Sequence, residues 1–534
     1  MAKAHDQPAL SRYWRPVSAL VFLVALGSVA LTIDDPGLAW DEPFSIGAGG
    51  SYAAWLAEPS LGAESIARHW APNREHPPLA KLLMGLSQAA MGEGSPIIAS
   101  RLVTALLFAL LVELVFQFAG GAFGGLAGLM AAGSLMCMPR VFGHAHFAAL
   151  DVPMALAWLA SVVAFDRAVQ RDTLAASILS GVCLGLALLT KINGIFLPIV
   201  LAGWGVGFHG KRALRPLVWT LLVGPVVFLL GWPWLWHDTL TRLAEYLAPQ
   251  WRVAIPVMYF GQWSKPAAWH YPLVMTLVTI PAGILFLVVL GSVRAVREFR
   301  RQPVLALVAL NAAYIIGLFM IPGVPRYDGV RLFLPAFPFL AILAGVAGKQ
   351  CWDWVAERSR RRPWRPLFLA AAFFLTQAGA VWLIHPCELS YYNALVGGLW
   401  GAEKLGLETT YWHDVVNRDL FRWLNRRCPV RATVAFYPVG ETVVFPPTDW
   451  KHLPNYYDTF YLNAPERRGL MAVRLEHARR YDFIVVNARK AMLLWHMKGG
   501  SRAAELAWRC LTERQPVFAI HRQGVLLAGV YAKE

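Results

Sequence analysis

Charged side chains are scarce in this sequence: Asp, Glu, Lys and Arg make up 15% of its 534 residues, whereas about a quarter is usual in a soluble domain. Hydrophobic residues make up 57%, which is far more than an intrinsically disordered chain contains. These two figures exclude disorder and argue against a soluble enzyme. They indicate a polytopic membrane protein, and many of the 23 Trp stand at the ends of apolar runs, as interfacial anchors do.

Signatures of several common function classes are also absent. The six Cys include no CxxC pair, which excludes a zinc ribbon and a thioredoxin-like site. The sequence has no P-loop, no HExxH and no GxSxG, so ATP-driven transport, metalloproteolysis and serine hydrolysis lack support. It has no DxD motif either, which disfavours an enzyme that holds a nucleotide sugar through a metal. The net charge of +16 comes from short segments between apolar runs and forms no stripe suited to nucleic acid.

Eleven apolar segments are candidates to cross a membrane, which takes about 20 residues of helix. They are 17–33, 97–119, 121–138, 149–165, 174–190, 193–208, 216–236, 271–293, 303–321, 332–348 and 366–384. The second and third are separated only by Gly120 and its neighbours, which predicts a tight helical hairpin there. A signal peptide is the alternative for the first segment, but no clear cleavage site follows it and ten more segments do.

Lys and Arg indicate the orientation, because short cytoplasmic loops are rich in them. The basic segments are 1–15, 167–171, 211–215, 294–301 and 349–365. The alternate connections are 34–96, 139–148, 237–270 and 322–331. We therefore expect a cytoplasmic N-terminus, and we expect the second set of connections and the C-terminus outside the cytoplasm.

No segment after residue 384 is apolar enough to span a membrane, so we divide the chain into a transmembrane domain, 1–384, and an extracytoplasmic α/β domain, 385–534. Predicted strands cover 432–437 and 483–486, and 517–520 with 525–531 form a hairpin with a Gly-containing turn. Predicted helices cover 412–427, 466–480 and 500–513. In an oxidising compartment two of the three Cys in this domain could pair, and the sequence does not choose among Cys387, Cys428 and Cys510.

Polar residues are rare inside the predicted spans, Glu113 and Asn311 being the obvious ones. Ionisable residues gather instead in the connections predicted to lie outside, above all in 34–96. There Asp41 and Glu42 follow the first span closely. Two adjacent carboxylates beside a bilayer are candidates for general-base work, with capping of a helix that starts near Pro43 as the alternative.

Five further side chains lie on the same predicted side of the membrane. His76 and Lys81 flank two prolines before a predicted amphipathic helix, Asp151 stands at a span entry, and Lys191 and Arg331 stand at span ends. The cations could bind a lipid phosphate. A lysine that snorkels, placing its ammonium at the membrane interface without binding a ligand, would occupy the same position in the sequence. The pair His144 and His146 suggests a metal only weakly, so no metal ligand is assigned and dependence on a divalent metal stays open.

These residues, in this order, resemble a known family. Asp41-Glu42 after the first span, His76-Pro77-Pro78-Leu79 with Lys81, and Asp151 at a span mouth look like the GT-C glycosyltransferases that use polyprenyl-phosphate sugars, over about residues 15–400. Protein O-mannosyltransferases and aminoarabinose-to-lipid-A transferases are the nearest groups. The segment 385–393, with Gly397 and Gly398 after it, resembles a stretch common in bacterial members, which implies the bacterial inner membrane.

The sequence therefore predicts an inverting glycosyltransferase that moves a sugar from a polyprenyl phosphate to an extracytoplasmic hydroxyl. Asp41 would be the base with Glu42 assisting, and His76, Lys81, Asp151, Lys191 and Arg331 would bind the donor. The acceptor, whether lipid A, another glycan, a lipid or a protein, is left open, as are the sugar and the oligomeric state. The alternative is a flippase for lipid-linked sugars, which would need polar residues at mid-membrane depth and inverted repeats.

Overall fold

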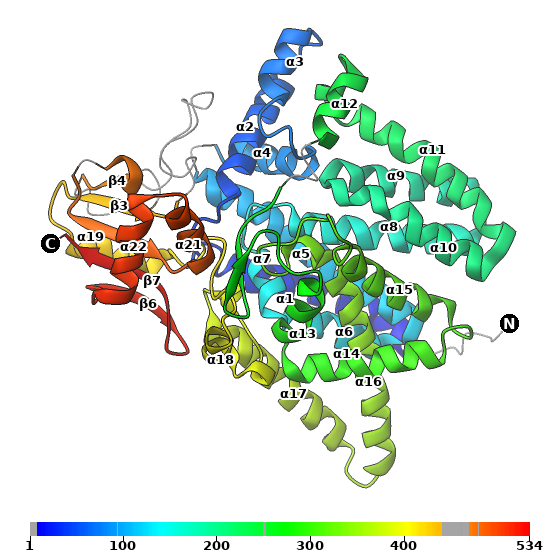
Figure 1. Ribbon diagram of the computed structural model, residues 1–534. Coiled ribbons are helices and arrows are strands. Elements are labelled where there is room, and N and C mark those ends of the chain that lie inside the picture. The colour runs from blue at the N-terminus through cyan, green and yellow to red at the C-terminus, as the bar shows by residue number, and fades with distance from the viewer. Residues whose placement is uncertain are drawn as a thin grey trace.

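A computed structural model describes residues 8–92, 94–248, 253–439, 461, 469–478 and 480–533. It has two parts, a body of helices and a C-terminal sheet domain. The sheet domain lies at one end of the body (Figure 1). The apolar helices of the body are α1 (Pro8–Ala30), α5 (Pro96–Phe123), α6 (Gly125–Met136), α8 (Asp151–Arg171), α9 (Leu174–Thr190), α10 (Leu197–His209), α11 (Leu214–Leu230), α13 (Tyr271–Thr279), α14 (Ala282–Arg297), α15 (Pro303–Leu318), α16 (Phe337–Arg358) and α17 (Trp364–Ile384).

Every one of the eleven predicted apolar segments is largely helical. Judged by length and composition, five helical stretches of the described chain can cross a membrane, and shorter apolar helices accompany them. The five are Pro96–Phe123, Asp151–Arg171, Ile192–Leu230, Arg331–Arg358 and Trp364–Ile384. The first half of α16, from Phe337 to Gly348, is buried, whereas α17 is mostly exposed, so the centre of the helical core is at the start of α16. The chain has the fold of a multi-pass α-helical membrane protein with a small sheet domain.

Two details of the predicted spans were wrong. The hairpin turns at Gly124, with a φ of 100°, and not at Gly120, because α5 continues to Phe123. Gly120 serves packing instead, since a Cβ there would lie 2.3 Å from Trp14. The segment 271–293 is not one helix, because α13 ends at Thr279 and α14 begins after Pro281.

The first long connection forms three helices, α2 (Glu42–Ala57), α3 (Ala63–Trp70) and α4 (Leu79–Met91). Two prolines precede α4, as the sequence predicts, since proline suits the start of a helix and not its interior. Helices α2 and α4 cross with their backbones in contact: a Cβ on Gly85 would lie 1.9 Å from the carbonyl oxygen of Gly49. This close crossing sets the positions of the residues just before both helices.

The C-terminal domain has a five-stranded sheet in the order β4-β3-β5-β7-β6. The strands are β3 (Thr433–Tyr437), β4 (Met471–Arg474), β5 (Phe483–Asn487), β6 (Phe518–Arg522) and β7 (Val525–Ala532). Strand β3 pairs in parallel with β4 and β5, whereas β7 is antiparallel to β5 and β6. The predicted hairpin is confirmed, and both of its turn residues, Gln523 and Gly524, have positive φ, as a tight turn of this kind requires.

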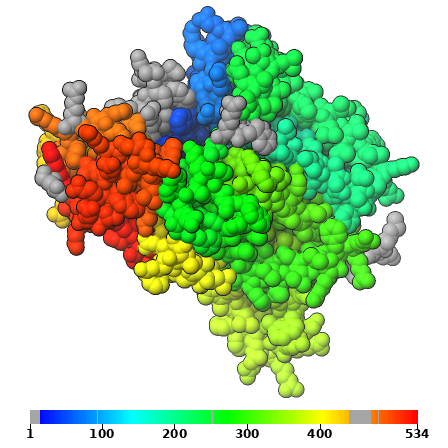
Figure 2. Space-filling model, viewed as in Figure 1, coloured from blue at the N-terminus to red at the C-terminus, as the bar shows by residue number. Residues whose placement is uncertain are grey.

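Helices α19 (Arg418–Arg427), α21 (Lys490–Lys498) and α22 (Arg502–Glu513) accompany this sheet. The helix predicted over 466–480 was wrong, because 471–474 form β4 and 475–477 only a short turn; residues 466–468 and 479 lie outside the described residues. Helix α21 was missed. It packs against the hairpin of β1 (Val257–Tyr259) and β2 (Gln262–Ser264), and this contact joins the domain to the body (Figure 2). All six cysteines are free, so no pair forms among the three in this domain.

Candidate active site at the junction of five helix ends

Five of the seven predicted site residues line one cavity of about 240 Å³. Each stands at the end of an element: Asp41 before α2, His76 before α4, Asp151 at the start of α8, Lys191 after α9, and Arg331 at the start of a short 3-10 helix that leads into α16. Backbone groups at helix ends are free of the helix ladder, so these positions can hold polar side chains beside an apolar body. The structure thus brings together residues separated by up to 290 positions.

Arg331 is at the centre of the charges in this cavity. Its guanidinium pairs with Asp41, and it lies 3.1 Å from Asp328 and 3.8 Å from Asp151. Lys191 donates to the other oxygen of Asp151 at 2.7 Å. Because Arg331 and Asp151 are almost completely buried, water does not solvate their charges, and the neighbouring opposite charges stabilise them instead.

Asp41 is the most accessible of the three carboxylates beside Arg331. Its side chain is one-third exposed, whereas that of Asp151 is 2% exposed. It occupies the position before α2 but makes no capping hydrogen bond there, so the capping alternative is not what the structure shows. The carboxylate is therefore placed to meet an incoming group, with Arg331 as its present partner.

Glu42 points away from the cavity and is fully buried. It receives two hydrogen bonds of 2.8 Å from Arg101, and its oxygens also accept from the amides of Ala39 and Ala148. Arg101 in turn donates to three backbone carbonyls of residues 33–37. The carboxylate has all its partners within the protein, and the pair holds the chain in front of Asp41 in place.

Lys81 does not line the cavity either. It is completely buried, and its Nζ donates to the carbonyl of His76 at 2.7 Å and to the carbonyl and side chain of Asn73 at 2.7 and 3.1 Å. Its ammonium also lies 5.4 Å from the ring centre of Tyr52. The lysine thus fixes the turn that carries His76, and this is a positioning role different from the predicted contact with a phosphate.

His76 reaches the cavity as a neutral side chain. Burial, together with the positive charges of Lys81, Lys191 and Arg331, lowers the pKa of His76 to about 3. A neutral imidazole donates or accepts a hydrogen bond but adds no charge. His76 is therefore suited to orienting a hydroxyl and not to balancing a phosphate.

The pair His144 and His146 does not form a joint site. His144 lies 3.8 Å from Asp151, while His146 contacts the hydroxyl of Thr32 and the carbonyl of Phe142. Within the residues that the structure describes, no group of three or more His, Cys, Asp and Glu side chains is arranged to hold a metal ion.

A second, larger cavity of about 450 Å³ adjoins the first and shares Asp41, His76, Lys191 and Arg331 with it. Its remaining walls are largely apolar and aromatic. Among them are Ile192, Phe196, Leu318, Phe319, Leu332, Trp412 and Trp495. Trp412 also stacks under Arg331, with 4.4 Å between the guanidinium carbon and the ring centre. The two cavities together offer a polar compartment and an apolar one on either side of the same cations.

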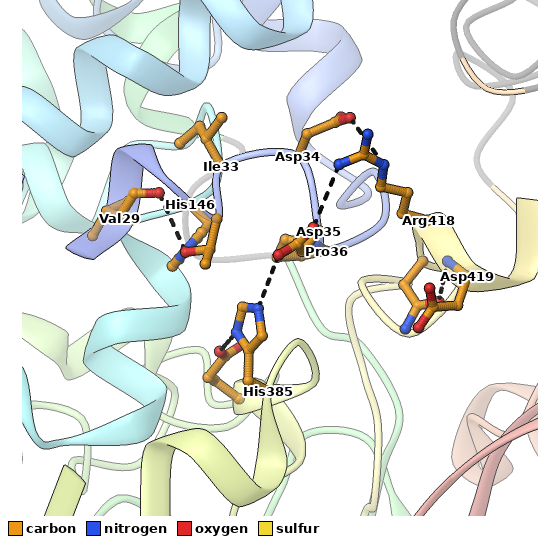
Figure 3. Close-up of polar contacts among 12 residues, drawn as sticks. Val29, Ile33, Asp34, Asp35, Pro36, His146, His385, Arg418 and Asp419 are labelled. Atoms are coloured by element: carbon orange, nitrogen blue, oxygen red, sulfur yellow. Dashed lines mark hydrogen bonds and ion pairs between the residues drawn. The ribbon is translucent and has the colours of Figure 1, made fainter. Parts of the chain in front are cut away.

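A second cluster braces the chain that leads to Asp41 (Figure 3). Arg418, just inside α19, lies 3.7 Å from Asp34 and 3.6 Å from Asp35. His385, just after α17, lies 3.2 Å from Asp35 and also pairs with Glu388. Burial disfavours protonation of His385, but the hydrogen bonds and charges of Glu388 and Asp35 outweigh burial and raise its pKa. The cluster ties the first loop both to the last helix of the body and to the C-terminal domain.

Sequence reasoning missed two residues that face the same cations. Asp328 stands three residues before Arg331, in the connection 322–331, and could have been found there. Arg489 lies in the C-terminal domain, donates to Asp328 at 2.7 Å and lines the apolar cavity. No motif surrounds it in the sequence, so only the three-dimensional structure reveals its place.

Comparisons with known proteins agree with this architecture. Residues 75–237 match the family model for dolichyl-phosphate-mannose-protein mannosyltransferase. ArnT from Cupriavidus metallidurans bound to undecaprenyl phosphate is similar in fold, with a TM-score of 0.50, 17% identity and 98% of each chain covered; its apo state has a TM-score of 0.53 at the same identity and coverage.

The archaeal oligosaccharyltransferase AglB from Archaeoglobus fulgidus, in complex with an inhibitory peptide and a dolichol-phosphate, has a TM-score of 0.50 and 12% identity, with 93% of this chain and 72% of that chain covered. No curated protein sequence matches the chain. The matched segment and the shared fold confirm the resemblance of this chain to the GT-C glycosyltransferases.

Proposed function

We propose that this protein is an inverting glycosyltransferase that moves a sugar from a polyprenyl phosphate to an acceptor hydroxyl. The observation that carries the proposal is the cavity itself, where an accessible carboxylate, Asp41, meets two cations, Lys191 and Arg331, beside an apolar compartment. The similar structures of ArnT with undecaprenyl phosphate and of AglB with a dolichol-phosphate support a lipid phosphate as the ligand.

The lipid phosphate binds where the two cavities join. Lys191 and Arg331 line the apolar cavity as well as the polar one, so a phosphate between them leaves its prenyl chain among Phe196, Phe319 and their neighbours. Charge-assisted hydrogen bonds from such cations are about twice as strong as neutral ones. The sugar and the acceptor then occupy the polar cavity, in front of Asp41.

The reaction needs a base more than an acid, because a phosphate is already a good leaving group. Asp41 accepts the proton of the acceptor hydroxyl as its oxygen forms a bond to the anomeric carbon. The bond from that carbon to the phosphate oxygen breaks on the opposite face, and its electron pair stays on the phosphate. Lys191 and Arg331 stabilise this growing charge in a site that is already arranged for it.

In the structure the base and the cation neutralise each other, since Arg331 pairs with Asp41. A phosphate that binds Arg331 competes with Asp41 for the same guanidinium. Binding of the donor therefore releases the carboxylate at the moment when a base is needed. Glu42, Lys81 and Asp151 act as positioning residues: the first two hold the chain around Asp41 and His76, and Asp151 holds Lys191 and Arg331.

The proposed place of the reaction is outside the cytoplasm, as the basic loops predict, in the bacterial inner membrane, as the resemblance to bacterial members of the family implies. The acceptor hydroxyl belongs to a lipid, a glycan or a protein. The C-terminal domain contributes Arg489, Met492 and Trp495 to the wall of the apolar cavity.

The test compares cells with and without the gene. Lipid-linked sugars and glycoconjugates are extracted and compared by mass spectrometry, and purified protein is then incubated with the polyprenyl-phosphate sugar that accumulates. We expect the donor to accumulate and one glycoconjugate to lose a sugar. A lipid-linked sugar that moves across vesicle membranes without any transfer would support the flippase alternative and contradict the proposal.

A further inference from the structure

Arg489 brings a charge from the C-terminal domain into the apolar cavity. It follows strand β5 and immediately precedes α21, and it is 2% exposed. The same cavity is lined by Lys191 and Arg331, which come from the helical body. A guanidinium buried this deeply needs a carboxylate, a phosphate or another anion beside it.

The bonds of Arg489 satisfy it only in part. Its Nη2 donates to one oxygen of Asp328 at 2.7 Å, and the other oxygen of Asp328 accepts from Arg331 at 3.1 Å. Its Nε is buried and has no hydrogen-bond partner among the residues that the structure describes. Asp328 therefore holds two guanidinium groups side by side, one from each part of the protein, and within the described structure the Nε of Arg331 also has no hydrogen-bond partner.

The three cations of the site are already paired with carboxylates: Asp41, Asp151 and Asp328 face Lys191, Arg331 and Arg489. A fourth carboxylate, Glu75, also lines both cavities, so the site has no positive charge in excess. A donor phosphate brings one negative charge as a diester, and the phosphate that leaves after transfer is a monoester, which carries up to two. A site that stabilises the transition state best must therefore supply more positive charge as the sugar departs.

We infer that Arg489 is a third phosphate-binding cation, supplied by the C-terminal domain, and that it favours the leaving phosphate over the bound donor. This inference rests on the proposed function, because it assumes a lipid phosphate in the apolar cavity. It makes the C-terminal domain part of the site, so that the helical body alone holds an incomplete set of cations.

The simpler alternative is that Arg489 only ties the two parts of the protein together through Asp328. Two substitutions separate the alternatives. Asp328→Asn breaks the tie but leaves Arg489 and Arg331 with more freedom to bind a phosphate. Arg489→Gln breaks the tie and also removes the charge. If Arg489 binds phosphate, the two variants differ in affinity, whereas a mere tie predicts the same effect for both.

The experiment titrates undecaprenyl phosphate into the purified full-length protein in lipid nanodiscs. Arg489→Gln should weaken binding by about ten- to a hundredfold, which is the range of a charge-assisted contact of about 1.5–3 kcal/mol. Asp328→Asn should keep wild-type affinity or exceed it, and Arg489→Lys should restore part of the loss. The control is Arg509→Gln, which should leave binding unchanged, because Arg509 is an exposed arginine of the same domain that pairs with Glu513 and lines neither cavity.

Two results would overturn the inference: wild-type affinity in Arg489→Gln, or an equal loss in Arg489→Gln and Asp328→Asn. Should Arg489→Gln fail to fold, Arg489→Lys and Asp328→Asn still decide, because weaker binding in Asp328→Asn together with full binding in Arg489→Lys would leave only the tie. A wild-type protein that binds no undecaprenyl phosphate would instead refute the proposed function, so the two failures are distinguishable.

Discussion

Asp41→Asn separates the two jobs that the structure assigns to this carboxylate. Asparagine has nearly the same shape but accepts no proton, so the base is lost. The same change removes the negative charge that pairs with Arg331 in the structure. Transfer and ligand binding should therefore respond in opposite directions, which loss of folding would not produce.

The expected sizes follow from the geometry. Loss of a general base lowers the rate of transfer by about two to four orders of magnitude. The pair of Asp41 with Arg331 is one-third exposed on the carboxylate side, so its strength lies between that of a surface ion pair and that of a buried one, at about 1 kcal/mol. Freeing Arg331 from it should tighten the binding of undecaprenyl phosphate about fivefold, since 1.4 kcal/mol corresponds to tenfold.

The assay measures single-turnover transfer and the affinity for undecaprenyl phosphate on the same purified variant. Asp172→Asn is a suitable control, because Asp172 lies at the far end of α8 with a left-handed backbone that Asn tolerates; both quantities should stay at their wild-type values. Transfer by Asp41→Asn at close to the wild-type rate would refute the assignment of the base. A weaker affinity would refute the competition between Asp41 and the phosphate.

Three further predictions concern the other charges. Lys191→Gln should weaken the binding of undecaprenyl phosphate about tenfold or more in the same titration, whereas Lys349→Gln, at the opposite end of the body, should leave it unchanged; equal affinities would withdraw the phosphate role of Lys191. Glu42→Gln should lower the free energy of unfolding by about 3–5 kcal/mol, because it leaves a buried arginine unpaired, and an unchanged melting temperature would contradict this. The pKa of His385 is raised by its cluster, so protonated His385 should stabilise the fold fully below its ordinary pKa of about 6.5 and lose this effect as the pH rises through the higher value. Melting temperatures of His385→Gln, measured across this pH range, should lack this dependence. Identical pH profiles for the variant and the wild type would contradict the prediction.

The sequence alone was sufficient for the class of fold and for the neighbourhood of the site. A membrane-spanning helix can be recognised from its sequence without knowing which helices pack against it. The thickness of the bilayer requires an apolar run of about 20 residues. The alternation of basic and less basic connections placed Asp41, His76, Asp151, Lys191 and Arg331 on one side. The structure does bring these five to one cavity, and their orientation in the membrane stays a prediction.

Which way each of those side chains points was decided only by the tertiary structure. Asp41 and Glu42 are neighbours of the same chemical type, yet one meets the cavity and the other meets Arg101, 59 residues away. Lys81 faces the turn at Asn73 because α2 and α4 cross closely at Gly49 and Gly85. A local sequence pattern does not predict the direction of a side chain, since this depends on which residues from distant segments pack beside it.

Arg489 is the clearest case of this division. The short apolar run at 483–486 was enough to predict strand β5, which precedes Arg489. Nothing in the same pattern distinguishes Arg489 from the other arginines of the domain. Only the packing of α21 against the β1–β2 hairpin carries it to Asp328, because a contact between segments 161 residues apart is a property of the folded chain and not of either segment.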